Sequence, residues 1–176
     1  MMNKQLLGVK NLSVDYVTER NRIRAVDNIS FGIENGEIFG LVGESGSGKS
    51  TFCKLISRLY VPNDGSVLID NYDVQKVEIS SIRRQLGIVS QDPLLFAGTI
   101  RDNITFGDES FSDKEIVEVS KICCAHEFIM ELPLGYNTKI SEKGSSLSGG
   151  QRQRIALVRA LLKKPKIITS ARCPSI

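Results

Sequence analysis

The sequence predicts an α/β fold with an antiparallel β part, a strand–loop–helix core and a helical part. Apolar and polar residues alternate between residues 6 and 39, which is typical of half-buried strands. An apolar run at 38–42 leads into a glycine-rich loop, after which a helix is expected. From Ser112 onward the apolar period changes from that of strands to that of helices. These three patterns place β structure early in the chain and mainly helical structure late in it.

The first part, residues 6–39, is expected to form antiparallel strands. The apolar residues that mark two strands are Val9, Leu12, Val14 and Tyr16 in the first and Ile29, Phe31 and Ile33 in the second. Asn35-Gly36 is a strong turn signal. The run at 38–42 then predicts a buried strand, and residues 50–59 predict the helix after the loop.

The middle of the chain predicts two short strands and then a helical insert. The strands are expected at 66–70 and at 88–90. Ser112 begins an S-x-x-E capping box, which marks the start of a helix. The apolar residues that then recur at helical spacing are Ile116, Val119, Cys123 and Met130. A helical insert is therefore expected over about 112–147.

A last helix is expected to begin at a second capping box, S-x-x-Q, in which Ser148 caps and Gln151 reaches back. Its expected apolar face is formed by Ile155, Val158, Leu161 and Leu162. Two lysines and then Pro165 end it, because cations suit the negative end of the helix dipole and proline stops propagation. Residues 166–168 start a further apolar run, whereas 169–176 lack the character of a core strand.

The composition excludes several classes of protein. The chain has 176 residues, of which 41% are hydrophobic and 24% charged, as in ordinary globular proteins. No stretch reaches the roughly 18–20 apolar residues of a membrane span, and no secretory leader is evident, so a cytoplasmic location is expected. A net charge of +3 without a basic block gives nucleic-acid binding no electrostatic support. The four cysteines lack C-x-x-C pairing and the single histidine, His126, falls on an apolar helical face, so no zinc site is expected.

The glycine-rich loop has the pattern G-x-x-x-x-G-K-[ST], known as Walker A, which binds nucleotide phosphates. The candidate binding residues are Gly43, Glu44, Ser45, Gly46, Ser47, Gly48, Lys49, Ser50 and Thr51. The glycines let backbone N–H groups point into a tight loop, and the following helix offers its positive end to the same anion. Lys49 adds a point charge over the terminal phosphates, and the Ser50 hydroxyl can ligate Mg²⁺.

A second glycine motif follows about a hundred residues later. Its residues are Leu147, Ser148, Gly149, Gly150 and Gln151. A capped helix N-terminus with two bare glycines is a second phosphate-binding surface. Together with the loop at 43–51, this LSGGQ sequence resembles the ATP-binding domain of ABC transporters, which has a P-loop NTPase core.

The resemblance covers about residues 6–168 and implies roles for several residues. ATP and Mg²⁺ would bind at 43–51, and Ser148, Gly149, Gly150 and Gln151 would face the ATP of a second such domain in a head-to-tail dimer. Gln91 matches the Q-loop glutamine, which would position Mg²⁺ and the attacking water. Tyr16 is the candidate for stacking on adenine, with an ordinary half-exposed strand tyrosine as the alternative. His126 is expected to be a packed histidine rather than a catalytic one.

The expected partners are a second ATP-binding domain and transmembrane permease domains on separate chains, which would hold the protein at the inner face of a membrane. The segment 91–104 and the E-[RK]-G element at 142–144 resemble exporters, whereas 25–31 and 42–46 resemble peptide importers. The direction of transport therefore stays open, with the exporter favoured.

In the family an acidic pair follows the last helix, and it should fall near 171–172. Here those positions hold Ala171 and Arg172, and arginine cannot act as a general base. Hydrolysis is therefore expected to be impaired, the core sheet to be incomplete at the C-terminus and the fold to be marginal. The expected organisation is one domain at 1–168 with an unrelated or frameshifted tail at 169–176.

Three alternatives to a transport ATPase remain open from the sequence. The first alternative is a non-catalytic regulatory protein that binds ATP. The second is a non-functional gene fragment. The third, an ABC protein of DNA repair or translation, is disfavoured by the nearly balanced charge and by the transporter-like segment after Gln91.

Overall fold

The computed structural model describes residues 5–17, 21–40, 49–141, 144 and 146–170. The chain forms two units, Met1–Arg83 and Arg84–Ile176, each with its own internal packing. The described helices all fall short of the length and apolar content that a membrane-spanning helix requires.

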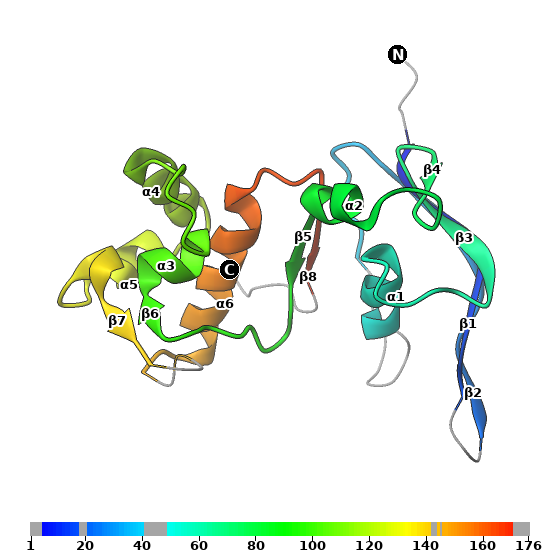
Figure 1. Ribbon diagram of the computed structural model, residues 1–176, viewed down its shortest axis with the longest axis horizontal. Helices are drawn as coiled ribbons and strands as arrows, with labels where there is room; N and C mark the ends of the chain where they lie inside the picture. Colours follow the sequence, from blue (N-terminus) through cyan, green and yellow to red (C-terminus); the bar gives the residue numbers. More distant parts are fainter. Residues whose placement is uncertain (1–4, 18–20, 41–48, 142–143, 145, 171–176) are drawn as a thin grey trace. The chain divides into compact units, whose positions relative to one another are not determined.

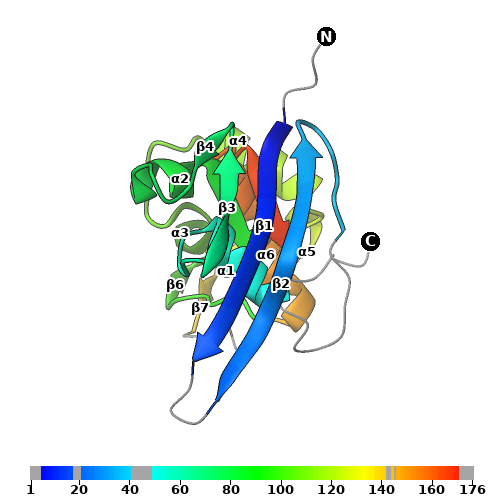
Figure 2. The same cartoon turned by 90° about the vertical axis from the view of Figure 1, so that its right-hand side faces the viewer.

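The first unit is built on a four-stranded antiparallel sheet with the strand order β2-β1-β3-β4. The strands are β1 (Gln5–Val17), β2 (Arg22–Glu34), β3 (Asp64–Ile69) and β4 (Tyr72–Asp73). Figure 2 shows β1 and β2 side by side as two long ribbons. The antiparallel strands expected within 6–39 are therefore confirmed. The short strand expected at 66–70 is also confirmed, but it runs from Asp64 to Ile69.

A bulge in β1 explains why its apolar residues do not alternate strictly. The register against β2 shifts between Val9 and Leu12 and again between Leu12 and Val14. Asn11 lies at this shift with a φ of 46°, and its backbone N–H donates to Ser30 Oγ at 2.8 Å. The extra residue lets Val9, Leu12 and Val14 all be buried although the first two are three positions apart.

The helix α1 (Lys49–Ile56) follows the glycine-rich loop, as expected, and buries Phe52, Leu55 and Ile56. It is shorter than the helix predicted at 50–59. Arg58 takes a left-handed φ of 51°, and the N–H groups of Leu59 and Tyr60 both donate to the Lys54 carbonyl. This tight C-terminal turn ends the helix after two turns.

The predicted strand at 38–42 is wrong over its described residues. Residues 38–40 form no strand, and the Ile38 side chain is 99% exposed; residues 41–42 lie outside the described part. An apolar run becomes a buried strand only when neighbouring strands pair with its backbone. None of the described strands pairs with 38–40.

The second unit contains a parallel pair, β5 (Leu86–Val89) with β8 (Ile167–Ser170), preceded by α2 (Ile79–Gln85), which crosses from the first unit. The strand expected at 88–90 is confirmed, but it begins at Leu86 and ends at Val89. Thr169 and Ser170 pair with Ile88 and Val89, so the expectation that they lack strand character is wrong. Pairing, together with the β-branched Thr169, extends the strand past the boundary placed at 168; residues 171–176 lie outside the described part.

Helices are the main secondary structure described in the second unit. They are α3 (Ile100–Thr105), α4 (Asp113–Ile122), α5 (His126–Met130), the 3₁₀ helix η1 (Gly135–Asn137) and α6 (Gly149–Leu162). The short pair β6 (Gly98–Thr99) and β7 (Lys139–Ile140) is antiparallel. The insert expected at 112–147 is therefore helical in its first two thirds and includes a short strand. Figure 1 shows α3, α4 and α5 gathered beside α6.

One core fills the space between these helices. It includes Ile100 and Ile104 of α3, Ile116 of α4, and Ile155 and Val158 of α6, all 0–1% exposed. Met130, expected on the apolar face of the insert, is instead 57% exposed. Cys124 has a φ of 51° and breaks the helix, so the apolar period does not continue from α4 into α5.

Candidate nucleotide-binding site

The glycine-rich loop lies mostly outside the described residues, which begin again at α1. The candidates there are Gly43, Glu44, Ser45, Gly46, Ser47 and Gly48, and the Lys49 side chain is likewise outside. Lys49 is the first residue of α1 and Ser50 is exposed in its first turn, whereas Thr51 is buried. The start of a helix immediately after the loop is the context that a phosphate site needs.

Tyr16, the candidate for adenine stacking, lies against α1. Its hydroxyl is 2.7 Å from Thr51 Oγ1, and its ring meets the Tyr60 ring edge-on at 5.7 Å between centroids. Lys54 Nζ lies 4.9 Å from the centre of the Tyr60 ring. The structure therefore brings two sequence candidates, Tyr16 and Thr51, into contact through a hydrogen bond between β1 and α1.

An ion-pair cluster fixes the backbone next to Tyr16. The Asp15 carboxylate is 1% exposed and accepts hydrogen bonds from Arg24 Nε at 2.9 Å and Arg22 Nε at 2.8 Å. These bonds, first from Arg24 and then from Arg22, lower the pKa of Asp15 below its ordinary 3.8. Asp15 is therefore ionised at neutral pH and holds β2 to β1 beside the tyrosine.

The capping box predicted at Ser148 is present. Gln151 N–H donates to Ser148 Oγ at 3.2 Å, and Ser148 N–H donates to Gln151 Oε1 at 2.9 Å. Gly149 and Gly150 are both exposed, and a Cβ added at Gly150 would meet no described atom within 4 Å. Packing within the described chain does not require these glycines, so the open helix N-terminus is free to approach an anion.

Gln91 follows β5 and is brought close to the signature helix α6. The Gln153 side-chain amide donates to the Gln91 carbonyl at 3.0 Å, while the Gln91 residue itself is exposed. The Ser50 hydroxyl and the Gln91 amide oxygen are hard oxygen donors, which suit Mg²⁺. They belong to separate units, so their pairing at one metal stays a prediction.

Two residues that the sequence interpretation did not single out hold the segment after Gln91. Asn103 is 0% exposed; its side-chain amide donates to the carbonyls of Phe96 at 2.9 Å and Thr99 at 3.0 Å. Arg159 of α6 donates to the carbonyls of Asn103 at 2.7 Å and Leu94 at 3.0 Å. A sequence signal existed for Asn103, which lies in the exporter-like segment 91–104.

Gly144 ends the E-K-G element, whose Glu142 and Lys143 lie outside the described residues. Its φ is 60°, and an added Cβ would be 2.9 Å from Leu95 Cδ1 and 3.3 Å from Arg152 Cδ. The glycine therefore lets the chain pass closely between the segment after Gln91 and the signature helix.

His126, expected to be a packed histidine, is half-buried with Nδ1 3.0 Å from the Tyr136 hydroxyl.

Comparison with known proteins agrees with these features. The ABC transporter family model matches residues 26–169. The chain is 50% identical over 143 residues to the toxin RTX-I translocation ATP-binding protein of Actinobacillus pleuropneumoniae, covering 81% of this chain and 20% of that protein. It is 45% identical over 159 residues to ABC transporter B family member 13 of Arabidopsis thaliana, covering 90% of this chain and 13% of that protein.

A solved structure of a bacterial Atm1-family ABC exporter with ATP bound is also similar, with a TM-score of 0.87 and 38% identity. The similarity covers 97% of this chain and 29% of that chain. The present chain thus spans a fifth or less of the length of the two curated relatives.

Proposed function

The chain belongs to the ABC transporter family, and we propose that it is the ATP-binding part of an exporter-type transporter. In this proposal the loop at 43–51 holds MgATP, and the signature at 148–151 of a second such domain closes over it head to tail. Closure would power transport through transmembrane permease partners at the inner face of a membrane. The exporter-like segment 91–104 and the exporter similarity support this direction.

The observation that carries the proposal is the open N-terminus of α6. Ser148 satisfies one backbone N–H by its side chain, and two exposed glycines follow it. No described atom fills the space at Gly150, so a phosphate group from another molecule can approach the helix dipole.

The candidate residues have distinct roles in this proposal. Lys49 neutralises the terminal phosphates, the Ser50 hydroxyl supplies an oxygen for Mg²⁺, and Gln91 orients the attacking water. Tyr16 provides an aromatic face for adenine next to α1, where its hydroxyl bond to Thr51 holds it. Ordering these groups before the nucleotide binds lowers the entropy lost on binding.

Hydrolysis by this chain is proposed to be slow. Ala171 and Arg172 occupy the positions where the family has an acidic pair, and neither can accept a proton from water. This observation also favours the second candidate, a regulatory protein that binds ATP without turning it over. Adding permease partners distinguishes the two candidate functions, because only a transport component would then couple ATP binding to transport.

Titration with a fluorescent ATP analogue tests the nucleotide site directly. Lys49→Ala should weaken binding in the presence of Mg²⁺ by about tenfold or more, which is ~1.4 kcal/mol. Lys76→Ala, which removes an exposed lysine elsewhere in the same unit, should leave affinity unchanged. Equal affinity in wild type and Lys49→Ala, or no binding at all, would overturn the proposal.

A further inference from the structure

We propose that Arg159 is a positioning residue that makes the signature helix α6 and the segment 91–103 move as one body. The inference rests on the proposed function, because it concerns how the effect of nucleotide binding at the signature reaches the surface formed after Gln91. Arg159 itself does not touch the signature glycines; it acts through the backbone that it holds.

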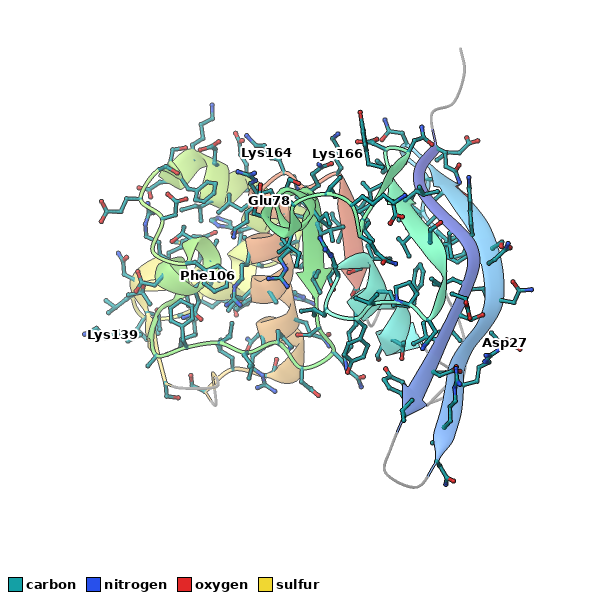
Figure 3. The ribbon with its side chains drawn as sticks, turned by 45° about the vertical axis from the view of Figure 1, so that its right-hand side comes forward. Asp27, Glu78, Phe106, Lys139, Lys164 and Lys166 are labelled. Carbon is teal, nitrogen blue, oxygen red and sulfur yellow. The ribbon has the colours of Figure 1, made fainter. Side chains whose placement is uncertain are left out.

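The contacts of Arg159 reach two separate points of the segment. Its Nε donates to the Asn103 carbonyl at 2.7 Å and its Nη1 to the Leu94 carbonyl at 3.0 Å. These partners lie 56 and 65 residues away in the sequence. The guanidinium also lies 4.5 Å from the centre of the Phe106 ring; Phe106 caps α3 and is labelled in Figure 3.

Asn103 extends this attachment to the rest of the segment. Its Oδ1 accepts from the Phe96 N–H at 3.0 Å, and its amide donates to the carbonyls of Phe96 and Thr99. Arg159 Nη2 lies 3.4 Å from the same Oδ1. A displacement of Arg159 therefore displaces the carbonyls at 94 and 103 directly and the turn at 96–99 through Asn103.

A second tie joins α6 to the beginning of the segment. The Gln153 amide donates to the Gln91 carbonyl at 3.0 Å. Residues 153 and 159 are about 9 Å apart along a helix axis. Two attachments at that separation fix the orientation of the segment on the helix as well as its distance from it.

Only arginine suits this position. Its partners are backbone carbonyls and an aromatic face rather than a carboxylate, and a planar fork of several donors can serve them together. Burial lowers the pKa of the Arg159 guanidinium, but an arginine side chain still remains charged at neutral pH. A lysine would reach one carbonyl and leave the other without its donor.

The surface that this body presents is apolar. Leu94 is 75% exposed, Phe96 37% and Phe106 54%, and the two rings stack at 5.8 Å. Because Arg159 of α6 binds the Leu94 carbonyl directly and the Phe96 backbone through Asn103, a change at the signature end of α6 would reach this surface without an intervening hinge.

Hydrogen exchange of the full chain tests the inference in two ways. Without nucleotide, the backbone amides of 91–106 and of α6 should show the same opening free energy and the same dependence of it on urea, as expected of one shared opening. In Arg159→Met, exchange of 91–106 should become about tenfold faster while α6 is unchanged. With MgATP, wild type should gain protection in both segments, whereas Arg159→Met should gain it only in α6 and keep its nucleotide affinity.

The control is Arg154→Met, which removes another arginine of α6, one that donates to the Cys124 carbonyl at 3.1 Å. It should leave the common opening and the MgATP response of 91–106 intact. Arg159→Lys should restore part of the response, and Gln153→Ala should loosen only the start of the segment. If Arg159→Met does not fold, Arg159→Lys and Gln153→Ala are compared with wild type instead.

Separate opening of the two segments in wild type would overturn the inference, as would an MgATP response of 91–106 that Arg159→Met retains in full. Absence of nucleotide binding in wild type and in all variants would instead refute the proposed function. Hydrogen exchange in increasing urea without nucleotide would then still test the inference. A response that is lost together with nucleotide affinity would also count against Arg159, since its role lies outside the nucleotide pocket.

Discussion

Single buried polar residues determine how the segment after Gln91 is arranged. Asn103 is 0% exposed, yet its side chain satisfies three backbone groups, of Phe96 and Thr99. A buried backbone group without a partner costs more free energy than a hydrogen bond contributes when formed. The shape of this loop therefore depends on one amide side chain.

Asn103→Ala should lower the free energy of unfolding by about 2–3 kcal/mol, because it removes a fully buried side chain and three part-buried hydrogen bonds to the backbone. Urea denaturation followed by circular dichroism measures the change. Asn137→Ala, at an exposed position of η1, should change stability by less than about 0.5 kcal/mol. Similar losses in both variants would show that Asn103 has no special structural role.

Alanine substitutions at two glycines with the same φ distinguish the cost of backbone strain from the cost of a steric clash. Gly36 and Gly65 both have a φ of +82°, but only Gly65 approaches another strand, with an added Cβ 2.4 Å from the Asn11 carbonyl oxygen. Gly36→Ala should cost about 1–2 kcal/mol, the usual price of a left-handed residue. Gly65→Ala should cost clearly more, since β1 and β3 must separate; equal melting temperatures would contradict this.

Among the secondary-structure elements, three helices whose starts the structure describes begin with the same local motif. Capping boxes at Thr99, Ser112 and Ser148 begin α3, α4 and α6. Each joins residues three apart, so each can form as soon as the first helical turn does. Only the box at Ser148 is followed by two glycines, and this difference separates a structural helix start from the candidate phosphate site.

Ser112→Ala and Ser148→Ala should each lower stability by about 1 kcal/mol through loss of the cap. Only Ser148→Ala should also weaken MgATP-dependent dimerisation, measured by light scattering or sedimentation. Ser112→Ala thus serves as the matched control for the loss of a cap. Weakened dimerisation in both variants would assign the effect to stability rather than to the signature.

At the scale of the whole molecule, paired carboxylates link stability to pH. Hydrogen bonds, from Thr99 in one case and Ser112 in the other, lower the pKa values of Asp102 and Glu115 below their ordinary 3.8 and 4.5. The arginine bonds to Asp15 act in the same direction. Such groups stabilise the fold above their unfolded pKa, and this contribution is lost as pH falls through the lowered folded value.

The urea midpoint should therefore be flat above about pH 5 and fall steadily below about pH 4. Asp15→Asn should lower the midpoint at pH 7, because Arg22 loses its carboxylate partner and Arg24 keeps only Asp27, and should make the acid-induced fall shallower. An acid-induced fall as steep as that of wild type would show that Asp15 does not contribute to it.

Features that depend on residues close together in the chain could be predicted from the amino-acid order alone. The capping boxes at Ser112 and Ser148, the helix after the loop and the antiparallel strands within 6–39 follow from spacings of a few residues. The two glycine motifs led to the ABC transporter family for the same reason, since each is a short continuous stretch of sequence.

Features that depend on residues far apart in the chain became visible only in the folded protein. The apolar run at 38–40 has no described strand to pair with, whereas Thr169 and Ser170 become a strand because β5 lies beside them. Arg159 meets carbonyls 56 and 65 residues away, a contact that no local pattern encodes. Backbone hydrogen bonds and burial require a second segment, and its arrival depends on the packing of the whole unit.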